Sequence, residues 1–458
     1  MNQFVEYIRF SPVMKQVIVV FILILGVAIG PLVQILHVGV REIAIAIMIV
    51  LMAMLVLVPS ERVLGLAFTL WVLTFAFGWR TIYLTTDLNV HPAEVLVFLL
   101  FFALIALSIV RHTRLDFSIP AILVVFAMFT LFGLFTALAG GTRWDYVVSE
   151  FKSFAEIIPV YYVTKWMIRT RESWERAARL TMIVAVYIGC LGLMDFFTPG
   201  LSQVLSGQPT IDPIFLSQNY SGASFSRVGF IFFGNFTAGF VIFTFIGFTV
   251  YHLLESLGKN AVKQVFLSAL LLIQAIGIYL SGYRGLWYSV AVFLIVYVFL
   301  RGRAVILIVA TLIGVTFLPP DFVTRFQSIF NPEFADSSQY DRIARANAAL
   351  DVLYRSPFTG AGWAGSGYVH SDLVQIAANL GIFGILTFLI WISGIIYQLF
   401  KLTRSSGWAS SYARVLLPSV CSLVVILAGE GLAHFVQLIM PVWFVFALCH
   451  RLPELESE

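Results

Sequence analysis

The feature that most constrains this chain is a series of about fourteen apolar segments, each close to the length that an α-helix needs to cross a bilayer. The runs are continuous rather than alternating, which favours helices over strands, because in lipid only a helix pairs its backbone polar groups within one segment. We therefore predict an all-α polytopic membrane protein with about 14 transmembrane helices. The segments cover approximately residues 17–36, 42–59, 63–78, 92–110, 118–139, 146–168, 177–197, 228–251, 264–281, 285–300, 304–318, 374–400, 412–429 and 435–449.

Composition excludes a soluble protein. Hydrophobic residues make up 60% of the chain and charged residues only 11%, against roughly 25% charged residues in soluble domains. We predict a single integral domain over residues 1–458, with membrane lipids as its surroundings. The net charge of +4 is small, so nucleic acid is not an implied partner. Cys190, Cys421 and Cys449 all fall inside apolar segments, which predicts neither a disulfide framework nor a metal cluster.

The distribution of lysine and arginine predicts the topology. If the N-terminus is cytoplasmic, the loops on that side, with Lys165 at a helix end, hold eighteen of the 28 basic residues. Cytoplasmic loops carry such an excess, so we place both termini in the cytoplasm. The first segment, 17–36, is long enough to span and has no small-residue cleavage site, so we expect no cleavable signal. The long polar interval 319–373 is then a large extracytoplasmic loop.

This loop has its own predicted order. Asp341 can cap a helix that runs to about Tyr354, with Ile343, Leu350 and Tyr354 on one stripe. Ser356 and Pro357 end that helix. Arg342 and Arg345 are three positions apart and share one of its faces.

A shaped turn follows the predicted helix. Residues 355–372 read RSPFTGAGWAGSGYVHSD, with four glycines in a short stretch. Glycine allows positive φ and close backbone approach, so the run predicts a turn that presents the next residues, including His370, to a substrate. These glycines are Gly360, Gly362, Gly365 and Gly367.

His370 is the candidate general base. An imidazole with a pKa near 6.5 can accept a proton at neutral pH, and this one lies between the glycine turn and the predicted helix that re-enters the membrane. A solvated loop histidine is the simpler alternative. Asp372 can orient the imidazole or cap the helix.

Two arginines are predicted at the same side of the membrane. Arg284 lies in LSGYRGLW, in the short turn between two apolar segments, with Gly282 and Gly285 on either side. Arg227 precedes the apolar run that starts near residue 228. Arginines at such positions bind charged ligands or form ion pairs; contact with lipid headgroups is the alternative for both.

Other polar residues within the segments have structural interpretations. Lys152 and Glu156 are one turn apart and can pair with each other, with a substrate-lining role second. Glu430 and His434 are also four apart, and we interpret them as an interfacial pair because two ligands make a weak metal site. Glu94, after His91 and Pro92, is a first-turn acid. Asp-x-Asp, Walker and Gly-x-Ser-x-Gly motifs are absent, which argues against metal-dependent sugar transferases, ATPases and serine hydrolases.

The second half of the chain resembles the O-antigen ligase and polymerase superfamily of bacterial envelope proteins. The matching pieces are RVGFIFFGN at 227–235, SGYRG at 281–285, and the run 344–384, which contains a Pro-Phe-x-Gly-x-Gly turn, the histidine and a Leu-Gly-x-x-Gly helix. The order of these elements is more specific than any one of them. Ser371 replaces the asparagine that usually follows the histidine, which puts in doubt whatever that asparagine contributes.

The resemblance implies a GT-C-like glycosyltransferase of the bacterial inner membrane whose catalytic region covers residues 227–400. It implies an undecaprenyl-diphosphate-linked glycan donor, a glycan or lipid-linked acceptor, and no metal or other cofactor. Carried over to this sequence, Arg227 and Arg284 hold the diphosphate and His370 serves the acceptor hydroxyl on the extracytoplasmic side. We expect four further residues to support the site: Asp372, Arg342, Arg345 and Arg355.

The alternative function class is a secondary transporter, for example a carrier of inorganic carbon. Lys152 and Glu156 inside a span would suit such a protein. A transporter is expected to place its main polar groups near the midplane on broken helices, whereas Arg227, Arg284 and His370 are all predicted at the outer side.

Overall fold

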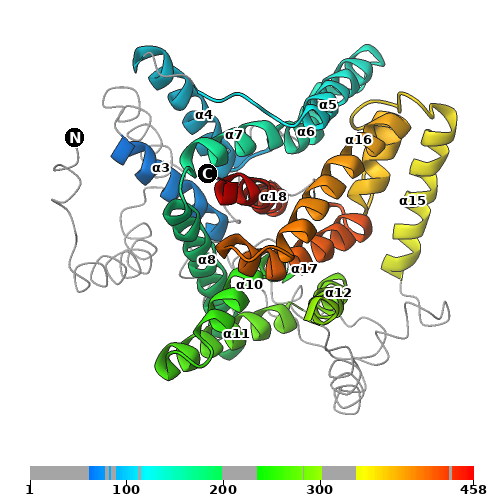
Figure 1. Ribbon diagram of the computed structural model, residues 1–458. Helices are drawn as coiled ribbons and strands as arrows, with labels where there is room; N and C mark the ends of the chain where they lie inside the picture. The colour runs from blue at the N-terminus through cyan, green and yellow to red at the C-terminus, as the bar shows by residue number, and fades with distance from the viewer. Residues whose placement is uncertain are drawn as a thin grey trace, which may run out of the picture.

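The protein is a helical bundle in which segments distant in sequence pack side by side (Figure 1). The computed structural model describes residues 61–77, 82–83, 89–111, 115–198, 235–281, 283–301, 337–432 and 436–457. Within these ranges the only strands are the two-residue β1 (Ile82–Tyr83) and β2 (Asn89–Val90), which pair antiparallel with Ile82 opposite Val90. All other regular elements are helices.

The helices follow the predicted apolar segments closely. The first half contains α3 (Glu61–Thr74), the short 3-10 helix η3 (Phe75–Phe77), α4 (Pro92–Arg111), α5 (Ala121–Ala139), α6 (Trp144–Ala155), α7 (Ile157–Met167) and α8 (Arg171–Phe197). The second half contains α10 (Asn235–Ser256), α11 (Ala261–Leu280), α12 (Arg284–Arg301), α15 (Ser337–Arg355), α16 (Asp372–Thr403), α17 (Trp408–Gly429) and α18 (Val436–Ser457).

Eight of the described helices are long and apolar enough to cross a membrane: α4, α5, α8, α10, α11, α16, α17 and α18. This confirms the prediction of a polytopic, all-helical membrane protein. The predicted segments 17–36, 42–59 and 304–318 lie outside the described residues. The predicted segment 146–168 forms two shorter helices, α6 and α7.

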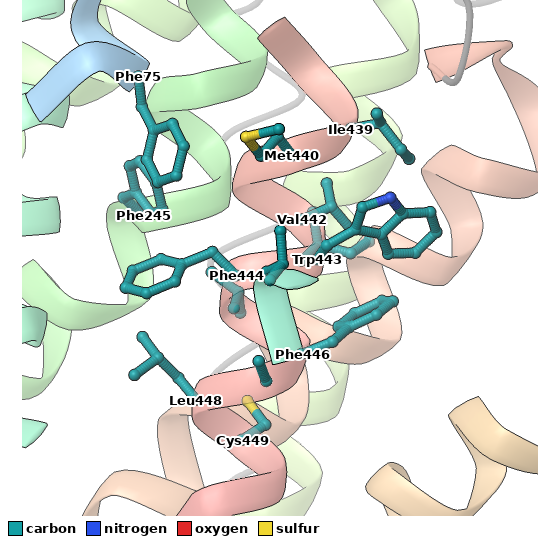
Figure 2. Close-up of a cluster of buried hydrophobic side chains, with 14 of the residues drawn as sticks. Phe75, Phe245, Ile439, Met440, Val442, Trp443, Phe444, Phe446, Leu448 and Cys449 are labelled. Carbon is teal, nitrogen blue, oxygen red and sulfur yellow. The ribbon is translucent and has the colours of Figure 1, made fainter. Parts of the chain in front are cut away.

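Helix α18 lies in the middle of the described bundle, where it packs against α7, α10, α16 and α17 (Figure 1). Its side chains from Leu438 to Leu448 are all apolar and buried. Figure 2 shows how Trp443 and Phe444 project from opposite sides of α18 into this core. In lipid, such close packing and interhelical hydrogen bonds hold helices together; Trp443 Nε1 donates to the carbonyl of Ser153 on α6 at 2.8 Å.

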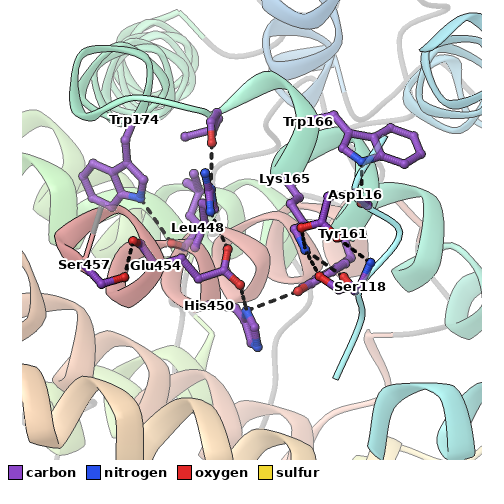
Figure 3. A network of polar contacts seen from close by, with 12 residues as sticks. Asp116, Ser118, Tyr161, Lys165, Trp166, Trp174, Leu448, His450, Glu454 and Ser457 are labelled. Atoms are coloured by element: carbon purple, nitrogen blue, oxygen red, sulfur yellow. Dashed lines mark hydrogen bonds and ion pairs between the residues drawn. The ribbon is translucent and has the colours of Figure 1, made fainter. Parts of the chain in front are cut away.

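The ends of α7 and α18 are joined by a polar network (Figure 3). Lys165 on α7 pairs with Asp116 at 2.7 Å and donates to Ser118 in the extended segment before α5. The hydroxyl of Tyr161 lies 3.3 Å from Nδ1 of His450 on α18. These contacts join α7, α18 and the segment before α5 at one end of the bundle.

The break between α6 and α7 corrects the predicted pairing in this segment. Pro159 has no N–H to offer the carbonyl of Ala155, which accounts for the interruption beside Glu156. The predicted partner of Lys152 was Glu156. In the structure Lys152 forms an ion pair with Glu94 of α4 at 2.6 Å. Neither carboxylate oxygen of Glu156 has a hydrogen-bond partner among the described residues. As predicted, Glu94 lies in the first turn of α4.

The bounds of the helix predicted from Asp341 to about Tyr354 are also corrected. It begins at Ser337 rather than at Asp341 and ends at Arg355. The predicted stripe of Ile343, Leu350 and Tyr354 is exposed, and the buried contact is made instead by Ala349 against Val369 and Ala378. Small side chains at this contact let α15 approach α16 closely, which the apolar periodicity alone did not indicate.

Candidate functional site

The glycine turn is inserted into the bundle rather than lying over it. Trp363 is completely buried and stacks on Phe154 of α6 with ring centroids 4.9 Å apart. Its backbone N–H donates to Gly133 and its indole N–H to Thr130, both on α5. These two carbonyls lie six and nine residues before the end of α5, or about 9 and 14 Å along its axis. The turn therefore occupies the depth of a membrane-spanning helix.

Irregular backbone at this depth needs hydrogen-bond partners for its polar groups, and the amide N–H groups of the turn have them. Each amide N–H from Gly360 to Gly367 donates to a partner within the protein. Ala361 and Gly362 donate to the carbonyls of Ala378 and Asn379 on α16. Of the four glycines, Gly360, Gly362 and Gly367 have positive φ, as expected of a shaped turn.

Helix α16 is broken at Gly381, which explains how the turn fits beside it. Gly381 has φ 71° and ψ −175°, a conformation that only glycine adopts readily. The part of α16 before the break is enclosed by protein, whereas from Ile382 onward one face is exposed. The remaining residues to Thr403 suffice to cross a bilayer alone, so the first part acts as a separate short helix that follows His370.

His370 lies at the start of this short helix, half-buried between α15 and the turn. Its Nδ1 is 3.2 Å from the hydroxyl of Tyr368, and the two rings meet edge to face with centroids 4.6 Å apart. Its Nε2 is 4.0 Å from Oδ2 of Asp341 on α15. The same carboxylate oxygen accepts a hydrogen bond from Arg345 Nε at 2.7 Å, and the Arg345 guanidinium lies over the ring of Tyr368.

These surroundings keep the imidazole neutral. The pKa of His370 is lowered to about 4 by burial, the largest cause, together with the positive charges of Arg342 and Arg345, while Asp341 opposes them. Each of these effects acts on the charged form of the imidazole. At neutral pH the side chain is therefore unprotonated and able to accept a proton.

Glu430 is the point at which three segments meet. Its carboxylate accepts a hydrogen bond from Arg342 of α15 at 2.6 Å. Its backbone carbonyl accepts one from the N–H of Asp372 at 3.2 Å. A Cβ placed on Gly285, directly after Arg284, would lie 3.4 Å from Glu430 Oε1. The chain next to Arg284 and the chain next to His370 thus converge on one residue, Glu430, which follows the end of α17.

The other predicted site residues are not all placed beside His370. Arg227 lies outside the described residues, and so does the side chain of Arg284, whose backbone begins α12. The cap of α16 is Ser371, which accepts a hydrogen bond from the N–H of Val374, so the prediction that Asp372 caps the helix was wrong. The carboxylate of Asp372 instead accepts from the backbone N–H of Leu432 at 2.9 Å. Arg355 ends α15 and is exposed.

Two acidic residues were missed or misassigned by sequence reasoning. Glu430 was interpreted as a partner of His434, which lies outside the described residues, yet it pairs with Arg342. Glu150 was missed, yet its carboxylate accepts a hydrogen bond from the backbone N–H of Ala364 in the turn. The signal in the sequence was that Glu150 lies among several polar residues of one predicted span. Three of these residues, Asp145, Ser153 and Glu156, are also buried in the structure.

The fold and the site together define a polytopic membrane protein with a glycine turn inserted among its helices, next to a half-buried histidine. The family described as O-antigen ligase matches residues 269–389, a range that contains Arg284, α15, the turn and His370. This match covers about a quarter of the chain and supports the resemblance to the O-antigen ligase and polymerase superfamily, a family that suggests a membrane enzyme of glycan transfer. None of the curated proteins matches the chain.

Proposed function

We propose that the protein is a glycosyltransferase that moves a glycan from undecaprenyl diphosphate to a hydroxyl of a glycan or lipid-linked acceptor, as a surface-polysaccharide polymerase or ligase. The reaction takes place on the extracytoplasmic side of the inner membrane, with both termini of the chain in the cytoplasm. The acceptor oxygen attacks the anomeric carbon, the bond from that carbon to the diphosphate breaks, and the diphosphate leaves with the electron pair. His370 takes the proton of the acceptor hydroxyl.

The observation that carries this proposal is the convergence at Glu430. It brings the backbone at Gly285, directly after Arg284, and the helix that begins beside His370 to the same residue, the first to its carboxylate and the second to its backbone carbonyl. A diphosphate held by Arg284 and Arg227 would then lie near a neutral imidazole. Arginine suits this role because its guanidinium can bind phosphate oxygens through two parallel hydrogen bonds.

The neighbours of His370 support its role as a base. Tyr368 occupies Nδ1, which leaves Nε2 on the side of Asp341 and Arg345 for the acceptor. A bound diphosphate would add negative charge, raise the basicity of the imidazole and so favour proton transfer as the leaving group departs. Arg342, Arg345, Asp372 and Arg355 complete the proposed supporting set.

The test is conversion of a polyprenyl-diphosphate glycan by the purified protein without any ion gradient. His370→Ala should lower turnover by about 10² to 10⁴, which is the usual worth of a general base, while the protein still inserts and folds. A matched control is His252→Ala, because His252 is on α10 and faces Glu255 instead. Arg284→Lys should also lose activity, because lysine cannot form the two-pronged contact. Wild-type turnover by the His370→Ala protein would refute the assignment.

One observation favours the alternative, a secondary transporter. The break between α6 and α7 places Glu156, with no hydrogen-bond partner among the described residues, beside the Lys152–Glu94 pair inside the bundle. Broken helices with buried charges are typical of transport sites. Gradient-driven uptake by liposomes, abolished by Glu156→Gln and unaffected by His370→Ala, would establish transport in place of glycan transfer.

A further inference from the structure

Glu150 reaches the glycine turn from a helix more than two hundred positions earlier in the chain. It lies on α6 with 7% of its surface exposed. Its Oε2 accepts a hydrogen bond from the backbone N–H of Ala364 at 2.8 Å and another from Nδ2 of Asn379 at 3.1 Å. A single carboxylate oxygen therefore joins α6, the turn and the short first part of α16.

Asn379 extends this contact to the rest of the turn. Its Oδ1 accepts from the Ser366 hydroxyl at 2.8 Å and from the Ser366 backbone N–H at 3.3 Å. Its backbone carbonyl accepts from the N–H of Gly362 at 2.9 Å. Two of the backbone N–H groups in the turn thus depend on side chains, Ala364 on Glu150 and Ser366 on Asn379.

The anchored residue has an unfavourable backbone conformation. Ala364 has φ 63° and is the only residue other than glycine with positive φ in the described part of the chain. An L-residue with a Cβ adopts this region at a cost. Such a conformation persists only where the surroundings hold it, and strained residues of this kind gather at functional sites.

The anchor lies close to the candidate base along the chain. Four residues separate Ala364 from Val369, which is buried against Ala349 of α15. His370 follows directly, and Ser371 then caps the short helix. With Ser366 held by Asn379 and Ser371 held by Val374, the segment that carries the imidazole is fixed at both ends.

We propose that Glu150, together with Asn379, is a positioning residue that holds the re-entrant turn in its strained conformation and so sets the place of His370. This inference rests on the proposed function for its effect on turnover. The anchoring itself is independent of any substrate. Glu150 does not touch the reacting atoms and acts through the turn.

The variants follow from the hydrogen bonds. Glu150→Ala removes the acceptor of Ala364 and of Asn379. Glu150→Gln keeps one oxygen that can accept both hydrogen bonds, because the native contacts use only Oε2. The matched control is Asp145→Ala, which removes another buried acid of α6 that pairs with Arg143 and has no contact with the turn among those the structure describes.

A fourth variant tests the strain directly. Glycine adopts positive φ without penalty, so Ala364→Gly should restore the turn in the Glu150→Ala background. Loss of packing or of general stability after Glu150→Ala would not be repaired by this change, because Ala364→Gly adds no contact. The double variant therefore separates positioning from a merely structural role.

The first measurement is amide hydrogen exchange of the full-length protein in nanodiscs, followed in peptides that cover residues 360–371. Glu150→Ala should speed exchange of the turn about tenfold or more, because it leaves the buried N–H of Ala364 without its acceptor. Glu150→Gln and Asp145→Ala should leave exchange as in the wild type, and Ala364→Gly should reverse most of the increase. Unchanged exchange in Glu150→Ala, or an equal increase in Asp145→Ala, would overturn the proposal.

The second measurement is turnover with the polyprenyl-diphosphate glycan. Glu150→Ala should lower kcat about ten- to a hundredfold, as expected of a displacement of about 1 Å at a reacting group, with KM for the donor unchanged. A rise in KM with kcat unchanged would overturn the positioning role. If the wild-type protein transfers no glycan, the proposed function fails, whereas the exchange measurement still decides whether Glu150 anchors the turn.

Discussion

The charge of Arg345 should control the protonation of His370, and this can be measured without a substrate. Both side chains lie at Oδ2 of Asp341, which is 2.7 Å from Arg345 Nε and 4.0 Å from His370 Nε2. Arg345→Gln removes the positive charge and keeps a side chain of similar length. It also leaves Asp341 without this partner, so that its carboxylate acts more strongly on the imidazole. Both changes favour the protonated histidine.

The size of the effect follows from the distances. Because both contacts are made to the same oxygen, the Arg345 Nε lies at most about 6.7 Å from Nε2 of His370. At that distance two unit charges interact by about 0.6 kcal/mol in water and about 2.5 kcal/mol at an effective dielectric of 20. Arg345 has 43% of its side chain exposed, which favours the lower part of this range. At 1.36 kcal/mol per tenfold change, the midpoint of the titration should move upward by about 0.5 to 1 pH unit from its value of about 4.

The assay is hydrogen–deuterium exchange at the imidazole C2 position, whose rate depends on protonation and can be assigned to His370 by mass spectrometry of its peptide. Arg355→Gln is the matched control. It removes the same charge from the same helix, ten residues further along, or about 15 Å at the rise of an α-helix. Its titration should match that of the wild type.

Three results would refute this reasoning. The midpoint could stay in place in Arg345→Gln, it could move to lower pH, or it could move equally in Arg355→Gln. The first two would mean that Arg345 does not hold the imidazole neutral. The third would mean that only the net charge of the helix matters.

The remaining predictions concern stability and can be checked by thermal unfolding in detergent. Trp363→Ala should destabilise the protein by about 3 to 5 kcal/mol, because it leaves a cavity beside α5 and α6; an unchanged melting temperature would contradict the inserted turn. Gly381→Ala should abolish the break in α16 or prevent folding, since its Cβ would collide with the carbonyl of Phe358; normal yield and activity would count against it. Arg342→Ala and Glu430→Ala should be non-additive in a double-mutant cycle, with a coupling of about 1 to 3 kcal/mol for this partly buried pair; strict additivity would show that the pair does not hold α15.

Much of the fold could be predicted from the sequence because membrane spans have a simple requirement. Continuous apolar runs gave α4, α5, α11, α12 and α17 within a few residues of their ends. Breaks inside such runs were harder to predict. The interruptions at Gly381 and beside Glu156 depend on single backbone conformations and on which neighbours can pair with the freed backbone groups.

The candidate site was predictable in part for a related reason. The glycine turn and the position of His370 follow from local residue types, and three of its glycines do have positive φ. The partners that hold the turn come from α5 and α6, and those around the histidine come from α15 and the end of α17. Pairs such as Arg342 with Glu430, 88 positions apart, depend on tertiary packing, which a single sequence does not reveal. The roles of Arg227, Arg284 and His370 stay predictions.

The central place of α18 has a consequence for the way the chain is assembled. Its Trp443 contacts a carbonyl 290 positions earlier, and its Leu448 accepts a hydrogen bond from a tryptophan 274 positions earlier. The earlier helices are synthesised before α18, so these contacts can form only after the last helix of the chain has been made. The packing at the centre of the bundle is therefore completed late in synthesis.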